Sequence, residues 1–131
     1  KWVVMSLDLT PVIHSGSQVI ESYGGGRFCI GGVFHNGSVS VFSDKTVSWP
    51  ITLANQISLV SINKEILISE AIEILLIGCG KVLIPPPKTL RSSLKEQKLI
   101  LEWMTTDAAC RTFNILLAEE RSVAAALIAV D

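Results

Sequence analysis

Ile-Glu-Ile-Leu-Leu-Ile-Gly-Cys-Gly, at residues 72–80, is the stretch of sequence that decides the fold of this chain. Its apolar part has the length of a strand and lacks a polar alternation, which predicts a strand buried on both faces at residues 72–77. The two glycines around Cys79 predict a tight turn where that strand ends. Ligand sites are common at such sheet rims, so this turn is a candidate site as well as a fold marker.

The chain after this strand alternates between helix and strand patterns. Three prolines at 85–87 force an extended segment, and the predicted elements then follow as a helix from about residue 88, a strand at 99–104, a helix from 105–107 to about 119, and a strand at 123–128. Leu90 and Leu94 recur at helical spacing in the first helix, as do Ala109, Phe113, Leu116 and Leu117 in the second. This alternation is typical of parallel strands joined by helices that cover the sheet.

The first part of the chain predicts short antiparallel strands. They fall at residues 18–23, 27–31, 38–42 and 46–49, with turns at 24–26, 36–37 and 43–45. Asn36-Gly37 is a strong signal for a tight hairpin turn. Ser38 and Ser40 alternate with Val39 and Val41, which predicts a strand with one wet face. A loop and a short helix at about 63–69, capped by Asn63, complete this part.

The fold class predicted from these patterns is α/β. One three-layer domain spans residues 18–131, in which an N-terminal antiparallel β-meander packs with a mixed sheet formed by a C-terminal βαβαβ unit. Residues 1–17 form a lead-in or partner-docking segment, whose apolar run at 2–7 is either an edge strand or a docking element. A chain of 131 residues is long enough to bury a core without disulfides or metal.

Composition excludes some classes of partner. The net charge is −1, so no global field attracts DNA, and RNA is not an expected partner. No stretch is long enough and free enough of charge to predict a transmembrane segment, although peripheral membrane association stays open. The 49% hydrophobic content is high for a short soluble chain and predicts an apolar patch that binds a protein. The three separate cysteines fit a reducing compartment or buried thiols.

Each catalytic motif that the glycine turn suggests fails at a named residue. Leu83 stands where a dinucleotide fingerprint requires its third glycine, and Val82 stands where a phosphate loop requires Ser or Thr. Cys79 resembles an exposed nucleophile, but nothing in the spacing brings His14 or His35 near it. We therefore predict no catalytic residue, no cofactor and no metal site.

Two kinds of surface remain as candidates. A cleft at the sheet rim would combine the turn with two residues of the last helix; its members are Gly78, Cys79, Gly80, Arg111 and Asn114. Asn114 has an alternative role, a structural bond to a strand end, since asparagine is a poor residue within a helix. The candidate partner surface comprises Trp2 and Val4 with a basic helical face of Lys88, Arg91, Lys95 and Lys98. That face is either solvated or a contact for RNA, anionic lipid or an acidic protein.

Several blocks of the sequence together resemble a known family. They are Ser22-Tyr23-Gly24, Phe28, Gly31 or Gly32, Gly37-Ser38-Val39, Trp49, residues 72–80, residues 107–116 with Glu119, and residues 123–127. This pattern resembles the domain of unknown function 498 family, which includes mitochondrial complex I assembly factor 3 and the adipogenesis-associated domain protein. The resemblance covers about residues 18–128. Cys79, where relatives often have Thr, and the three prolines at 85–87 depart from it.

The resemblance implies a three-layer β/α domain without an established enzymatic activity. It also implies a non-catalytic assembly or scaffold protein of respiratory complex I biogenesis, which binds other assembly factors or subunits in the mitochondrial matrix or at the matrix face of the inner membrane. Two alternatives stay open. One is a scaffold or subunit of another large mitochondrial assembly, such as the mitoribosome. The other is a small-anion or metabolite-binding protein, or an enzyme, that uses the rim at residues 78–80.

Overall fold

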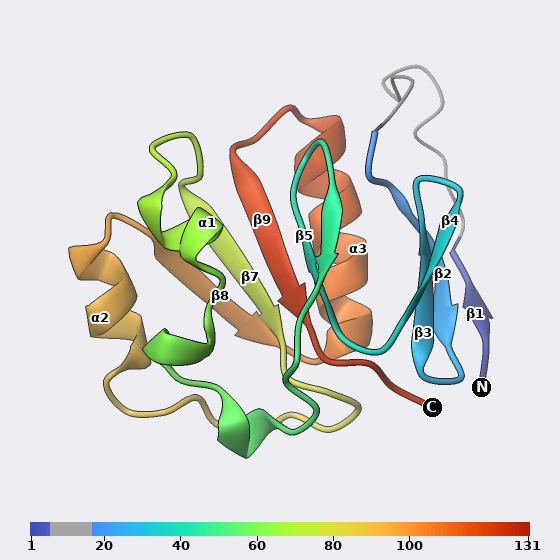
Figure 1. Ribbon diagram of the computed structural model, residues 1–131, viewed down its shortest axis with the longest axis horizontal. Coiled ribbons are helices and arrows are strands. Elements are labelled where there is room, and N and C mark those ends of the chain that lie inside the picture. Colours follow the sequence, from blue (N-terminus) through green and yellow to red (C-terminus); the bar gives the residue numbers. More distant parts are fainter. Residues whose placement is uncertain (6–16) are drawn as a thin grey trace.

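Two β-sheets form from this one chain in the computed structural model, which describes residues 1–5 and 17–131 (Figure 1). The antiparallel sheet has the order β1-β2-β3-β4, with β1 Val3–Val4, β2 Ile20–Gly24, β3 Arg27–Ile30 and β4 Val33–Asn36. The mixed sheet has the order β6-β5-β9-β7-β8, with β5 Val39–Val41, β6 Thr46–Ser48, β7 Ile74–Gly78, β8 Ile100–Met104 and β9 Val123–Leu127.

The central strand β7 is buried along its whole length, as the apolar run predicts. It pairs in parallel with β8 on one side and with β9 on the other. Helix α2, Leu90–Glu96, connects β7 to β8, and helix α3, Thr106–Ala118, connects β8 to β9. The predicted βαβαβ unit is therefore confirmed. No helix in the described part of the chain has both the length and the apolar character needed to cross a bilayer.

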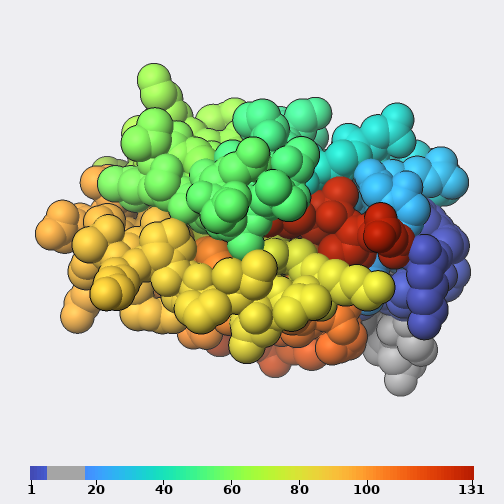
Figure 2. All heavy atoms as spheres, turned by 90° about the horizontal axis from the view of Figure 1, so that it is seen from below, coloured from blue at the N-terminus to red at the C-terminus, as the bar shows by residue number. Residues whose placement is uncertain are grey.

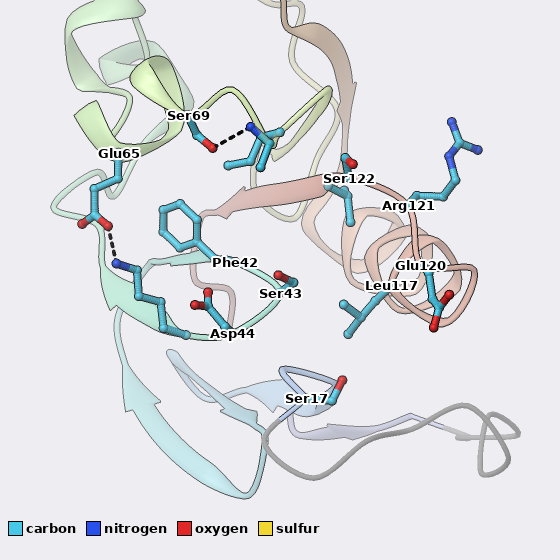
Figure 3. Close-up of a pocket in the computed structure, with 14 residues that line it drawn as sticks. Ser17, Phe42, Ser43, Asp44, Glu65, Ser69, Leu117, Glu120, Arg121 and Ser122 are labelled. Carbon is cyan, nitrogen blue, oxygen red and sulfur yellow. Dashed lines mark hydrogen bonds and ion pairs between the residues drawn. The ribbon is translucent and has the colours of Figure 1, made fainter.

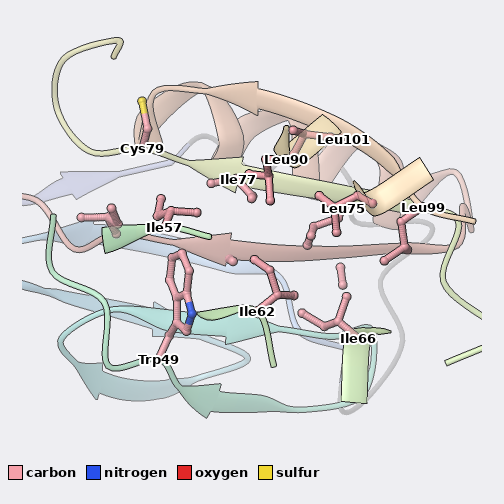
Figure 4. Close-up of a cluster of buried hydrophobic side chains, with 14 of the residues drawn as sticks. Trp49, Ile57, Ile62, Ile66, Leu75, Ile77, Cys79, Leu90, Leu99 and Leu101 are labelled. Carbon is pink, nitrogen blue, oxygen red and sulfur yellow. The ribbon is translucent and has the colours of Figure 1, made fainter. Parts of the chain in front are cut away.

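Two hydrophobic cores lie on opposite faces of the mixed sheet. On one face, Trp49, Ile62 and Ile66, from the segment that contains two 3₁₀ turns (Ala54–Gln56 and Leu59–Ser61) and helix α1 (Lys64–Ile68), pack with α2 against Leu75 and Ile77 of β7 (Figure 4). On the other face, α3 and the inner face of the antiparallel sheet pack against the strands. The predicted three-layer architecture is confirmed.

The predicted hairpin at Asn36-Gly37 was wrong. Strand β4 ends at Asn36 in the antiparallel sheet, and β5 begins at Val39 in the mixed sheet, so the segment between them crosses from one sheet to the other. The hairpin turn is instead Gly31-Gly32, where φ values of 57° and 81° allow the tight connection between β3 and β4. Strand β4 itself was not predicted from the sequence.

The predicted wet face of β5 was also wrong, because β5 is an interior strand covered on both sides. Ser40 is fully buried, and its hydroxyl donates a hydrogen bond of 2.8 Å to Asn63 Oδ1. Ser38 is buried as well, and its Oγ accepts a bond of 3.0 Å from the Ala129 N–H. Asn63 precedes α1 as predicted, but its side chain bonds Ser40 and does not cap the helix.

The lead-in segment contributes a short edge strand. Val3 pairs with Tyr23 and Val4 with Ser22, which confirms the predicted edge strand for these two residues. The Met5 N–H extends the pairing with a bond of 2.9 Å to the Glu21 carbonyl. The rest of the predicted apolar run, residues 6–7, lies outside the described residues, as does His14.

Candidate functional site

The glycine turn after β7 is held by the first residue of α3. The Thr106 hydroxyl accepts a hydrogen bond of 3.0 Å from the Gly80 N–H and donates one of 2.8 Å to the Ile128 carbonyl. Gly78 lies so close to this helix that an added Cβ would lie 2.9 Å from the Thr106 Cα. The two glycines therefore allow β7, β9 and α3 to meet at one point, which is a structural role.

Cys79 lies in the core beneath this turn. Its side chain is buried, and its Sγ lies 3.5 Å from the Val82 carbonyl oxygen. His35 lies on β4 in the antiparallel sheet, away from the parallel strand ends. The described residues thus show no histidine placed to activate this thiol.

The side chains of Asn114 and Arg111, both on α3, make their polar contacts with groups outside the glycine turn. The Asn114 amide accepts a bond of 2.9 Å from the Ile20 N–H and donates one of 2.9 Å to the Ile20 carbonyl. This is the predicted alternative role, a structural bond to a strand end. The Arg111 guanidinium is exposed and lies 3.6 Å from the Asp107 carboxylate.

A pocket of about 290 Å³ does lie at the predicted rim. Cys79 and Gly80 line it, but Gly78, Arg111 and Asn114 do not; its other residues are Thr52, Leu53, Ala54, Lys81, Val82, Ile84, Ile128, Ala129, Val130 and Asp131. The structure therefore does not bring the five predicted cleft residues together in this pocket.

The position of this rim pocket follows from the chain topology. The connection from β7 leads to β8 on one side, and the next connection returns to β9 on the other side of β7. The pocket lies outside the carboxyl ends of β7 and β9, where this reversal leaves a crevice. Such switch points are where α/β proteins usually bind ligands.

A larger pocket, of about 810 Å³, lies at the opposite ends of the same strands (Figure 3). Phe42, Ile72 and Val123 are among its lining residues, as are Lys45 and Glu65, which form a salt bridge. Its charged groups come from segments distant in sequence, so no local motif predicted it. Charges of both signs line this pocket, which does not indicate a single class of ligand.

Helix α2 is too short to carry all four cations of the predicted basic face. Helix α2 spans only Leu90–Glu96, so Lys88 precedes it and Lys98 follows it, with a left-handed φ of 64°. The Arg91 guanidinium donates a bond of 2.6 Å to the Leu101 carbonyl on the edge strand β8. Arg91 therefore covers an open sheet edge, and the prediction of one continuous basic face was wrong in extent.

The outer face of the antiparallel sheet carries an exposed cluster of aromatic and basic side chains. The guanidinium carbon of Arg27 lies 5.2 Å from the Trp2 ring centroid and 4.7 Å from that of Phe34. The two rings are 5.8 Å apart, and Trp2 and Phe34 expose 38% and 56% of their surface. Val4, 75% exposed, lies on the neighbouring edge strand. We call Trp2, Val4, Arg27 and Phe34 the outer-face cluster.

The sequence predicted two members of the outer-face cluster and missed the other two. Trp2 and Val4 were predicted as partner surface, whereas Arg27 and Phe34 were not. The signal for Phe34 is the Gly31-Gly32 turn, because it creates the strand on which Phe34 faces outward. Gly24, opposite Arg27 on β2, lets β1 approach, since an added Cβ would lie 1.7 Å from the Lys1 carbonyl oxygen.

The pKa shifts in the described residues have structural causes. Burial raises the pKa of the Cys110 thiol and, to a smaller extent, that of the Cys29 thiol, so both stay protonated at neutral pH. A hydrogen bond of 2.5 Å from the Thr105 hydroxyl lowers the pKa of Asp107 at the start of α3. These groups do not form an acid and base pair that faces either pocket.

Comparison with known proteins identifies animal proteins named as assembly factors and bacterial proteins of solved structure. A Drosophila melanogaster protein named NADH dehydrogenase (ubiquinone) 1 alpha subcomplex assembly factor 3 is 36% identical over 94 residues, which cover 70% of this chain and 48% of that protein. A Danio rerio protein of the same name is 32% identical over 114 residues, covering 87% of this chain and 66% of that protein. The chain thus spans about half to two-thirds of these relatives.

A solved bacterial structure has the same fold. It is described as the crystal structure of an outer membrane protein from Bartonella henselae, and it superposes with a TM-score of 0.80 at 38% identity over 89% of this chain and 98% of that one. The family described as "Protein of unknown function (DUF498/DUF598)" matches residues 20–128. Since this match covers most of the chain, the chain belongs to the DUF498/DUF598 family.

Proposed function

We propose that this protein is a non-catalytic mitochondrial assembly factor, which acts in respiratory complex I biogenesis by binding protein partners. The names of the fly and zebrafish relatives support this role. We place the protein in the matrix or at the matrix face of the inner membrane, on the same basis. Its partners would be other assembly factors or subunits of the growing complex.

The outer-face cluster is the observation that carries this proposal. The inner face of the antiparallel sheet packs in the core, whereas the outer face presents two aromatic rings to solvent. Tryptophan, other aromatic side chains and arginine are enriched at the centres of protein interfaces.

A capture experiment with two matched variants tests the proposal. The tagged protein is expressed in mitochondria and purified with its partners, alongside the Phe34→Ser and Ile115→Ser chains. These two residues have similar exposure, 56% and 52%, but Ile115 lies on α3, away from the outer-face cluster. We expect complex I components with the unmodified chain and with Ile115→Ser, and their loss with Phe34→Ser. Recovery of mitoribosomal proteins in their place would favour the alternative assembly, and equal capture by both variants would contradict the role of this face.

The rim pocket favours a second candidate function, the binding of a small metabolite that carries an anionic group. It lies at the topological switch point, and its charged lining residues are Lys81, which can bind such a group, and Asp131, which can bind a hydrogen-bond donor of the same ligand. A library of phosphate- and carboxylate-bearing metabolites should raise the melting temperature of the unmodified protein more than that of Lys81→Ala. If no compound raises the melting temperature, this candidate fails.

A further inference from the structure

We propose that Arg27 binds a carboxylate of the protein partner, an aspartate or glutamate side chain within an apolar segment that covers the outer-face cluster. This inference rests on the proposed protein-binding function and names the chemistry of the contact. The antiparallel sheet, drawn in blue to cyan, lies at the end of the molecule opposite α2 (Figure 2), so a partner can cover its outer face without contacting α2.

Two aromatic rings contact the Arg27 guanidinium, and no carboxylate of the described residues pairs with its charge. Trp2 and Phe34 lie within 5.2 Å and 4.7 Å of its central carbon. Within residues 1–5 and 17–131, no hydrogen bond or salt bridge engages this group. The acidic side chain of the neighbouring strand, Glu21, directs its Oε1 to the Gly32 N–H. Arg27 therefore offers an uncompensated positive charge on an apolar face.

A carboxylate fits this group better than a neutral side chain does. The guanidinium presents parallel N–H donors along its edge, which match the two oxygens of a carboxylate. Its contacts with Trp2 and Phe34 restrain the side chain before the partner arrives, so less conformational entropy is lost on binding. The exposed rings and Val4 then provide apolar surface for the residues that flank the acidic one.

The charge distribution favours a protein partner over nucleic acid or anionic lipid. Arg27 is the single Lys or Arg within the four strands of the antiparallel sheet as the structure describes them, and exposed Lys1, which precedes Trp2, adds one cation beside the cluster. Nucleic-acid and lipid surfaces are multiply charged and are usually bound by several cations in a row. Arg27 alone contacts the two aromatic rings, and a single guanidinium on an apolar face suits one carboxylate better than a row of phosphates.

Titration of the full ¹⁵N-labelled chain with two capped pentapeptides tests the inference. One peptide alternates leucine with aspartate, and its control alternates leucine with asparagine, so the two differ only in charge. We expect the aspartate peptide to shift the Arg27 Nε–Hε signal and to bind about tenfold more tightly than the control, a difference of about 1.4 kcal/mol. Equal affinity of the two peptides, or no shift at millimolar peptide, would overturn the inference.

Two variants and a third ligand sharpen this test. Arg27→Lys keeps the charge but removes the planar donor edge, so we expect it to lose most of the preference for aspartate. Arg121→Ala removes an exposed positive charge at the turn before β9, away from the cluster, and should keep the preference. A short single-stranded oligonucleotide that shifts the same signals more strongly than the aspartate peptide would also overturn the inference.

The outcome is distinguishable from failure of the proposed function. If the aspartate peptide binds at Arg27 but the protein captures no complex I components, the assembly role fails and the carboxylate site stands. If capture proceeds but the peptides bind equally, and Arg27→Lys captures as well as the unmodified chain, the carboxylate site fails and the assembly role stands.

Discussion

The Asn114 side-chain amide pairs with both backbone polar groups of Ile20, at 2.9 Å each. Asn114 lies on α3, which packs on the mixed sheet, whereas Ile20 begins β2 in the antiparallel sheet. The pairing of β2 with β3 is irregular between Ile20 and Ser22. The amide thus makes the two hydrogen bonds that a neighbouring strand would make with Ile20, and it joins α3 to the antiparallel sheet through one buried contact.

Replacing Asn114 with alanine should therefore destabilise the fold. Two buried backbone groups would lose their partner, and we expect the free energy of unfolding to fall by about 2–4 kcal/mol, measured by urea denaturation. Arg111→Ala, one turn earlier on the same helix, breaks only an exposed ion pair of 3.6 Å and should change it by less than about 1 kcal/mol. Similar losses in the two variants would contradict this account.

The Thr106 hydroxyl should stabilise the rim through its two hydrogen bonds. Thr106→Val keeps the shape of the side chain but leaves the Gly80 N–H and the Ile128 carbonyl without this partner. We expect a loss of about 1–3 kcal/mol in the free energy of unfolding. Thr106→Ser retains the hydroxyl, so calorimetry should place its melting temperature above that of Thr106→Val. The reverse order would show that packing of the methyl group matters more than the hydroxyl.

Asp107 should make the stability of the protein dependent on pH in the acid range. The hydrogen bond from Thr105 lowers the pKa of Asp107 in the folded state, so the ionised carboxylate stabilises the fold at pH values above its unfolded pKa, about 3.9. This contribution is lost as the pH falls through the folded-state pKa. Asp107→Asn should therefore lower the melting temperature at neutral pH and by less at pH 2. A constant difference between pH 7 and pH 2 would exclude this linkage.

The sequence predicted the three parallel strands of the mixed sheet well because their signals are local, but it placed β5 and β6 in the antiparallel meander. The apolar run of β7, the prolines after it and the periodic leucines of α2 each identify one element, and chain order then implies parallel pairing. The failures lie where a choice depends on the other sheet. Gly31-Gly32 and Asn36-Gly37 both tolerate positive φ, and the local sequence does not determine which of the two closes a hairpin.

The candidate sites were harder to predict, because they join residues whose proximity depends on sheet pairing. Asn114 was recognised as unusual within a helix, but its partner on β2 lies 94 residues away. Trp2 precedes β1 and Arg27 begins β3, with β2 between these two strands, and Phe34 lies on a strand that the sequence did not reveal. The outer-face cluster therefore required the register of all four strands.

Gly24 should control whether the outer-face cluster forms. It has a φ of 128°, and an added Cβ would lie 1.7 Å from the Lys1 carbonyl oxygen. Gly24→Ala should therefore displace β1 from β2, and with it Trp2 from Arg27. We expect faster amide exchange at Met5, whose N–H bonds the Glu21 carbonyl, and a red shift of tryptophan fluorescence. The mixed sheet, to which Gly24 does not belong, should keep its slow exchange.

Gly25→Ala is the matched control, because it separates backbone strain from steric contact. Gly25 also has a positive φ, 60°, but an added Cβ would meet no atom within 4 Å. Its substitution should cost about 1 kcal/mol through the left-handed backbone alone and leave β1 paired. Faster exchange at Met5 in Gly24→Ala, but not in Gly25→Ala, would show that the missing side chain at Gly24 holds the edge strand in place. Equal exchange in the two variants would show that turn strain alone releases β1, and the cluster would then depend on the turn as a whole.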